Sequence, residues 1–142
     1  MSPRIAVVIL IGLVPLRAQA PSSISVWDGV YTADQAKHGE SLYRDHCERC
    51  HGLELEGDDE SVALTGETFE ANWDTLPLGK LYQRIRRDMP YNDPGKLSPE
   101  INAAVLAFIL KSNGFPSGET ELPHNEDLLN LIRFDTSKPA KK

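Results

Sequence analysis

The sequence contains few aromatic residues and few cysteines. Phe, Trp and Tyr make up 7% of its 142 residues, and there are two cysteines and two methionines. With so few large rings, the core must be built from aliphatic side chains or around a group that the sequence does not encode. Repeats and strand-like alternation of polar and apolar residues are also absent, which favours an all-α fold.

No apolar run is long enough to cross a membrane, but the first twenty residues have the pattern of an export signal. Arg4 is followed by the apolar run "IAVVILIGLVPL" and then by "AQA". A spanning helix needs about 20 apolar residues. We therefore expect residues 1–20 to be a signal peptide cleaved after Ala18 or Ala20, and the mature protein to be periplasmic or secreted, without stable membrane insertion. An uncleaved N-terminal anchor is the alternative.

The sequence has no long block of one charge. Loss of the signal would remove Arg4 and Arg17 from the 15 basic residues and nothing from the 21 acidic ones, so the mature chain is more negative than the formal net charge of −6. Nucleic acid and anionic lipid bind positive surfaces, so we expect neither as a partner. On net charge alone, a redox partner with a basic or apolar docking surface is favoured.

Three helices are predicted, over residues 32–47, 78–88 and 98–114. Thr32 and Ser98 stand at the N-cap positions of the first and third helices, and Gln35 follows Thr32 at the spacing of a capping box. Gly39 in the first helix either allows a second helix to approach closely or is simply tolerated there.

The remaining chain is predicted to be mostly loop. Residues 52–73 show one or two helical turns at most, and a loop of this length usually surrounds something functional. We expect a single domain over residues 21–118 after the signal peptide. The tail over residues 119–142 is expected to be partly helical and then disordered.

The two cysteines lie together in "CERCH", residues 47–51. A redox dithiol of the thioredoxin kind would need a preceding strand, a disulfide here would close only a very small loop, and zinc would need a fourth ligand. The pattern C-x-x-C-H is the signal for covalent attachment of a c-type haem. On one helical turn Cys47, Cys50 and His51 share a sector of about 100°, so two thiols can meet the vinyl groups while the imidazole reaches the iron.

Met89 is the candidate for the sixth iron ligand. It is the only methionine left after signal removal, it ends the predicted second helix, and Pro90 follows it. Methionine sulfur is the usual partner of histidine in cytochromes c. A methionine that merely fills the core, or a second imidazole from His38 or His124, is the alternative.

The motif "CERCH", the pair "MP", and Gly39 with Phe108 resemble the class I cytochromes c over Trp27 to Phe115. "LTGETFEANW" and "NGFPSG" look like bacterial single-haem cytochromes and the cytochrome domains of quinone-cofactor alcohol dehydrogenases. The resemblance implies a fold of short helices and long loops around one covalent haem c, with iron held by His51 and Met89. It also implies that Val62 stands where relatives carry a proline whose carbonyl accepts the imidazole N–H. The implied haem pocket is lined by Leu55, Leu64, Phe69, Leu81 and Ile85, with Trp73 near the propionates.

These observations together predict an electron carrier that is not an enzyme. An iron with both axial positions filled leaves no place for substrate, so one-electron transfer with redox proteins is expected, from a dehydrogenase donor to an oxidase acceptor by resemblance. Two alternatives stay open. In the first, the chain would be a dedicated cytochrome subunit of a dehydrogenase complex, with "NEDLLNLIRF" as a docking element. In the second, it would be a haem peroxidase or gas sensor with an open iron site.

Overall fold

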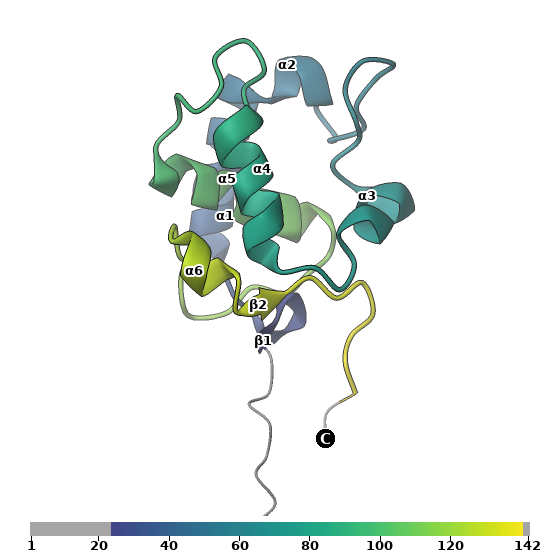
Figure 1. The fold of residues 1–142 in the computed structure, drawn as a ribbon, viewed down its shortest axis with the longest axis vertical. Helices are drawn as coiled ribbons and strands as arrows, with labels where there is room; N and C mark the ends of the chain where they lie inside the picture. Colours follow the sequence, from purple (N-terminus) through teal and green to yellow (C-terminus); the bar gives the residue numbers. More distant parts are fainter. Residues whose placement is uncertain (1–23, 141–142) are drawn as a thin grey trace, which may run out of the picture.

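Two long helices cross at the centre of the fold, α1 (Ala33–His46) and α5 (Pro99–Ser112). The computed structural model describes residues 24–140 and is shown in Figure 1. A Cβ at Gly39 of α1 would overlap the carbonyl oxygen of Ala104 and come within 3.1 Å of Cβ of Phe108. The close-approach interpretation of Gly39 is therefore confirmed, since a side chain here would force the two helices apart.

The middle of helix α5 is buried. Ser98 caps it by accepting a hydrogen bond from the backbone N–H of Ile101, and Pro99 occupies its first turn. Every residue from Asn102 to Leu110 is buried. Helix α1 packs on one side of this stretch and α4 on another.

Three shorter helices surround the crossing of α1 and α5. They are α2 (Glu48–His51), α3 (Gly66–Trp73) and α4 (Leu78–Asp88). Helix α4 buries Leu81, Tyr82 and Ile85, and it has the bounds predicted for the second helix, with Met89 as its C-cap. In Figure 1, α4 stands near the centre of the molecule, with α2 at the top and α3 to the right. The α2 and α3 segments come from the long region between α1 and α4.

The C-terminal segment packs into the same core. It contains α6 (Glu126–Leu129) and β2 (Ile132–Arg133), which pairs in parallel with β1 (Ile24–Ser25), next to the 3₁₀ helix η1 (Val26–Asp28). Leu122, Leu129, Ile132 and Phe134 are buried. The segment "NEDLLNLIRF" is therefore packed against its own domain. Strands of two residues are too short to show alternation, which explains why the sequence did not indicate them.

Gln35 does not act as predicted. Thr32 caps α1 by accepting from the N–H of Gln35, but the Gln35 side chain does not return to the Thr32 backbone. Instead its amide accepts from the N–H of Leu122 at 2.7 Å and donates to the carbonyl of Leu122 at 2.9 Å. The second hydrogen bond of the capping box, from the Thr32 backbone to the Gln35 side chain, is thus absent, and Gln35 instead binds the C-terminal segment at Leu122.

The N-terminal predictions fall outside the described part of the chain. The segment predicted to be a signal peptide, residues 1–20, and the last two residues of the tail are not among residues 24–140. Within that range, no helix combines the length and apolar character needed to span a membrane.

Candidate functional site

The C-x-x-C-H residues form a single helical turn. Helix α1 ends at His46, Cys47 is its C-cap, and the backbone N–H groups of Cys50 and His51 donate to the carbonyl of Cys47 at 3.1 and 3.0 Å. Cys47 is half-buried and Cys50 exposed, and both thiols are free. The backbone therefore forms the helical turn from which the sequence predicts a common sector for the two sulfurs and the imidazole.

The ring of His51 is held by the loop that follows it. His51 is buried, and its Nδ1 lies 2.8 Å from the carbonyl oxygen of Val62. Because a carbonyl can only accept, Nδ1 carries the proton and donates, which leaves Nε2 as the metal-binding nitrogen. The loop is also bonded to the motif by the N–H of Gly57, which donates to the carbonyl of His51 at 2.8 Å.

The thiol chemistry argues against a redox dithiol. Burial, and then the neighbouring Cys50, raise the pKa of the Cys47 thiol to about 11. Reactive dithiols have a lowered pKa, because the thiolate is the attacking species. A zinc site is also not indicated, because among residues 24–140 no three His, Cys, Asp or Glu side chains lie close enough together to hold a metal ion. The role predicted for Cys47 and Cys50, forming thioether bonds to haem, requires neither a lowered thiol pKa in the folded chain nor a cluster of zinc ligands.

Met89 is presented by the end of α4. Its N–H donates to the carbonyl of Ile85 at 3.1 Å, closing the helix, and its half-buried side chain stands at the C-cap. The N–H of Gly95 lies 3.4 Å from the Met89 carbonyl, so the loop after Pro90 returns to the methionine. Backbone bonds on both sides thus fix the residue that the sequence singles out.

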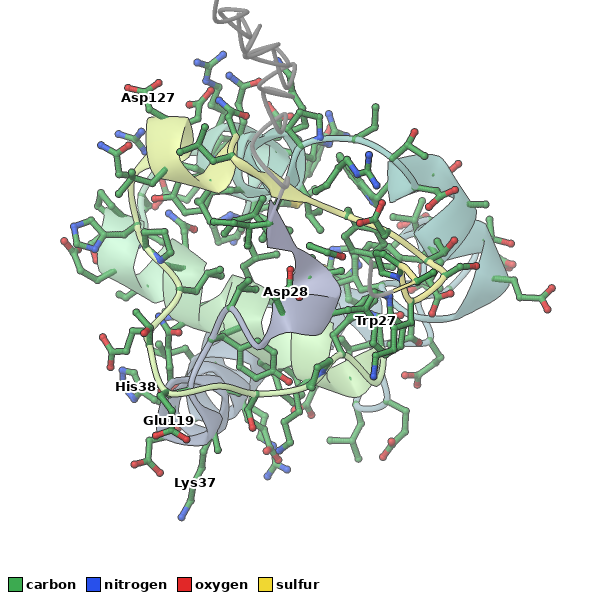
Figure 2. The ribbon with its side chains drawn as sticks, turned by 90° about the horizontal axis from the view of Figure 1, so that it is seen from below. Trp27, Asp28, Lys37, His38, Glu119 and Asp127 are labelled. Atoms are coloured by element: carbon green, nitrogen blue, oxygen red, sulfur yellow. The ribbon has the colours of Figure 1, made fainter. Side chains whose placement is uncertain are left out.

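The two alternative imidazoles are directed to solvent. Figure 2 shows His38 beside Lys37 on the outside of α1, and His38 is exposed. His124 is also exposed, and its Nε2 lies 3.6 Å from the Glu100 carboxylate. A buried axial ligand needs a side chain that points into the fold, which neither histidine provides.

The predicted pocket residues belong to one connected core. Leu55, Phe69, Leu81 and Ile85 are buried, and Leu64 and Trp73 are half-buried against them. Phe69 contacts both Trp73 and Phe134, with ring centroids 6.4 and 6.2 Å apart. These side chains come from the loop after His51, from α3 and from α4, so the segments predicted to surround the haem do supply apolar side chains.

Two side chains with roles at the site were not singled out from the sequence. The Tyr43 hydroxyl donates to the carbonyl of Gly52 at 2.7 Å, and burial raises the pKa of this phenol. Asn113 donates to the carbonyl of Leu64 at 2.9 Å. Tyr43 precedes Cys47 by one helical turn, and that spacing could have indicated its role. Asn113 gave no such signal, because its partner lies 49 residues away.

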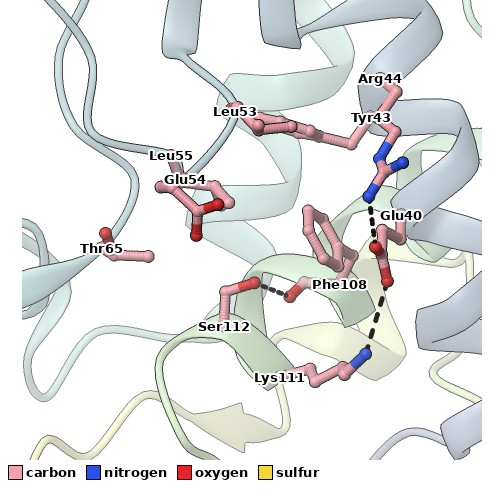
Figure 3. A pocket seen from close by; sticks show the side chains of 10 residues that line it. All are labelled: Glu40, Tyr43, Arg44, Leu53, Glu54, Leu55, Thr65, Phe108, Lys111 and Ser112. Carbon is pink, nitrogen blue, oxygen red and sulfur yellow. Dashed lines mark hydrogen bonds and ion pairs between the residues drawn. The ribbon is translucent and has the colours of Figure 1, made fainter.

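A groove of about 420 Å³ lies elsewhere, where α1 and α5 meet the loop after His51. Figure 3 shows its lining, in which Glu40 bridges Arg44 at 2.9 Å and Lys111 at 3.5 Å. It shares only Leu55 with the predicted haem pocket and contains neither cysteine, nor His51, nor Met89. Charged and open, it does not fit a large apolar cofactor.

The donor set and its surroundings fit an iron porphyrin. Two unpaired thiols and an imidazole with Nε2 free lie on one turn, and a thioether ends a helix whose inner face is apolar. Short helices and long loops around this set define a class I c-type cytochrome. Residues 34–109 match the family described as cytochrome c oxidase, cbb3-type, subunit III. The chain belongs to this family, whose cytochrome c domain carries covalently bound haem c with iron.

A solved structure supports the same fold. The crystal structure of the sulfane dehydrogenase SoxCD from Paracoccus pantotrophus contains a chain that is 26% identical, with a TM-score of 0.51. The match covers 82% of this chain and 66% of that one, slightly less than two thirds of its length. No curated protein sequence gave a significant match.

Proposed function

We propose that this protein is an exported single-haem electron carrier whose iron is held by His51 and Met89. The observation that carries the proposal is the bond between His51 Nδ1 and the Val62 carbonyl at 2.8 Å. It sets the tautomer and orientation of the imidazole before any metal is bound, as metal-ligating histidines require. Family membership supports electron transfer as the activity.

The remaining ligand choice rests on the position of Met89. It is a thioether at a helix end that backbone bonds hold on both sides, whereas His38 and His124 are exposed. When bound, the haem stores and releases one electron, and a methionine ligand favours the reduced state. The chain's own contribution is to hold both axial ligands and to exclude water with Phe69, Leu81 and Ile85.

Visible spectra of the purified holoprotein, with and without carbon monoxide, test this ligand set. The parent protein should be low-spin and should not bind carbon monoxide, because both axial positions are filled. Met89→Ala should bind carbon monoxide and have a lower reduction potential. His124→Ala and His38→Ala serve as controls and should match the parent. Carbon monoxide binding by the parent would contradict the proposal and favour the peroxidase or gas-sensor alternative.

Export is proposed from the sequence of residues 1–20. The mass of the mature protein, isolated from a periplasmic fraction, should correspond to a chain that begins at Gln19 or at Pro21. A haem protein that stays with the membrane and keeps residues 1–20 would instead establish the anchor alternative.

A second candidate function is that of a cytochrome subunit within a dehydrogenase complex. The likeness to a chain of the SoxCD structure favours it, at 26% identity. Gel filtration of the protein from its native source separates the two roles. A free carrier should elute near its own mass, which is 15.8 kDa before processing. Co-elution with a larger dehydrogenase would support the subunit role.

A further inference from the structure

The charges of this acidic protein are unevenly distributed between the two sides of the site. Residues 78–97, which include α4 and the Met89 loop, carry several basic residues against only Asp88 and Asp93. The basic residues are Lys80, Arg84, Arg86, Arg87 and Lys96. A segment with this balance is locally positive, although the whole chain has a formal net charge of −6.

Helical periodicity places most of these cations on one face. Lys80, Arg84 and Arg87 follow one another at spacings of four and three residues, so they form a stripe along α4. All three are exposed, as is Arg86. The opposite side of the helix carries the buried Leu81, Tyr82 and Ile85 and faces the core. The positive stripe therefore faces solvent and runs to the turn that presents Met89.

Few of these cations are neutralised within the fold. Arg84 pairs with Asp88 at 2.7 Å, and Lys96 pairs with Asp93 at 3.0 Å. Within residues 24–140, no carboxylate forms an ion pair with Lys80, Arg86 or Arg87. Their charge is thus available to a partner.

The loop on the His51 side has the opposite charge. Between Leu53 and Ser61 it contains Glu54, Glu56, Asp58, Asp59 and Glu60 and no basic residue. Backbone N–H groups of Glu60 and Ser61 donate to Asp58 and lower its pKa, which keeps this carboxylate charged at neutral pH. The chain therefore has a negative side next to His51 and a positive side next to Met89.

An exposed aromatic ring follows α4 in the chain. Tyr91 is 86% exposed and follows Met89 by two residues. Arginine and tyrosine are the residues most enriched at protein interfaces, where a ring supplies contact area and cations select the partner's charge.

We propose that the α4 basic face, defined as Lys80, Arg84, Arg86, Arg87 and Tyr91, docks an acidic patch on a redox partner protein. This proposal rests on the proposed electron-carrier function and names the kind of partner. Encounter between redox proteins is steered by the local field at the contact surface, and exposed charges beyond about 8–10 Å are screened at physiological salt. The attraction at the contact surface is therefore set by the cations of α4 itself, and the expectation drawn from net charge is reversed here.

Two inorganic oxidants of opposite charge test the local field. Ferricyanide, an anion, and tris(phenanthroline)cobalt(III), a cation, each take one electron from the reduced holoprotein, forming ferrocyanide and the cobalt(II) complex. In stopped-flow measurements, oxidation by ferricyanide should slow as salt is raised, and oxidation by the cobalt complex should not. A net-negative protein without a positive docking face would show the reverse.

Charge-reversal variants locate the effect. Lys80→Glu/Arg87→Glu should slow the ferricyanide reaction about 10-fold at low salt, within the range of electrostatic steering. Lys37→Glu/Lys138→Glu makes the same change in net charge away from α4 and should change the rate less than about 2-fold. A spectrum of each variant confirms that the haem ligands are unchanged. Equal slowing in both pairs would overturn the proposal.

A binding measurement on the reduced protein gives a readout independent of electron transfer. Titration with a decaglutamate peptide should shift the amide NMR signals of residues 80–91 and leave those of residues 53–62 unchanged. Shifts confined to other surfaces, or none at millimolar peptide, would contradict the docking face. If neither oxidant takes an electron from the protein, the electron-carrier function itself fails, and the two failures are thereby distinguished.

Discussion

Gly39 of α1 lies directly against the carbonyl oxygen of Ala104 of α5, with no room for a side chain between them. This contact sets how closely the two central helices approach, and hence the position of the turn that carries Cys47, Cys50 and His51 at the end of α1. The rings of Tyr43 and Phe108, with centroids 5.2 Å apart, pack at the same crossing.

Gly39→Ala should therefore destabilise the holoprotein by about 2 kcal/mol, although alanine is the better helix former. The added methyl group must push α1 away from α5. Ser41→Ala, at an exposed position of the same helix, should be neutral or slightly stabilising. Denaturant unfolding monitored by far-UV circular dichroism measures both. Equal stabilities of Gly39→Ala and the parent would mean that the crossing tolerates a wider separation.

Phe134 tests whether the C-terminal segment is part of the core. It is 1% exposed, and its ring centroid lies 5.1 Å from that of Phe115. Phe134→Ala should lower the free energy of unfolding by about 3–5 kcal/mol, because it leaves a cavity within an aromatic cluster. Leu131→Ala, three residues earlier and 62% exposed, should cost less than about 0.5 kcal/mol. A small effect at Phe134 would instead favour a tail that docks elsewhere.

Gly57 positions the carbonyl that holds His51. Its φ of 67° lies in the left-handed region, and an added Cβ would come within 2.6 Å of the N atom of Ala63. Gly57→Ala should cost about 1–3 kcal/mol of stability and weaken the bond from His51 Nδ1 to Val62. A weaker bond makes the imidazole less basic, so the reduction potential should rise.

Val62→Ala is the matched control for Gly57→Ala. The Val62 side chain is 73% exposed, and only its backbone carbonyl contacts His51. Protein-film voltammetry should find its potential unchanged. The proton signal of His51 Nδ1 should shift in Gly57→Ala alone, and a shift of equal size in both variants would contradict the positioning role of Gly57.

Asp74 ties the C-terminal segment to the end of α3 in a pH-dependent way. The N–H and hydroxyl of Thr136 donate to its carboxylate at 2.9 and 3.0 Å, and these bonds lower the pKa of Asp74 below 3.8. A depressed pKa gives stability that is fully present above the unfolded pKa and lost as the pH falls through the folded one. Asp74→Asn should thus be less stable than the parent at pH 7, and the difference should shrink below about pH 3.8.

Unfolding free energies of both proteins at pH 7 and pH 3 check this dependence. Glu119→Gln, which removes a carboxylate without a hydrogen bond among the described residues, is the control and should differ little from the parent at either pH. A difference for Asp74→Asn that stays constant between the two pH values would show that the carboxylate charge does not hold Thr136.

Much of the fold and the core of the site follow from local signals in the sequence. The helix caps at Thr32 and Ser98 and the C-x-x-C-H turn each depend on neighbouring residues, so spacing alone reveals them. Met89 was identified by elimination as the candidate sixth ligand, and in the structure it is the C-cap of α4.

Contacts between distant segments decided the rest. The side chain of Gln35 is hydrogen-bonded to the backbone of Leu122, 87 residues away, and that of Asn113 to the backbone of Leu64, 49 residues away. No local sequence pattern could predict either pair. The parallel pairing of β1 with β2 joins the two ends of the domain in the same way.

Charge shows the same division most clearly. The amino-acid composition determines a net negative protein, because a total needs no geometry. The sequence also shows where positive charge gathers, in residues 78–97, and where negative charge gathers, in residues 53–61. Only the tertiary structure shows that Lys80, Arg86 and Arg87 are exposed and form no ion pair within residues 24–140, because folding decides which side chains reach solvent and which meet a carboxylate.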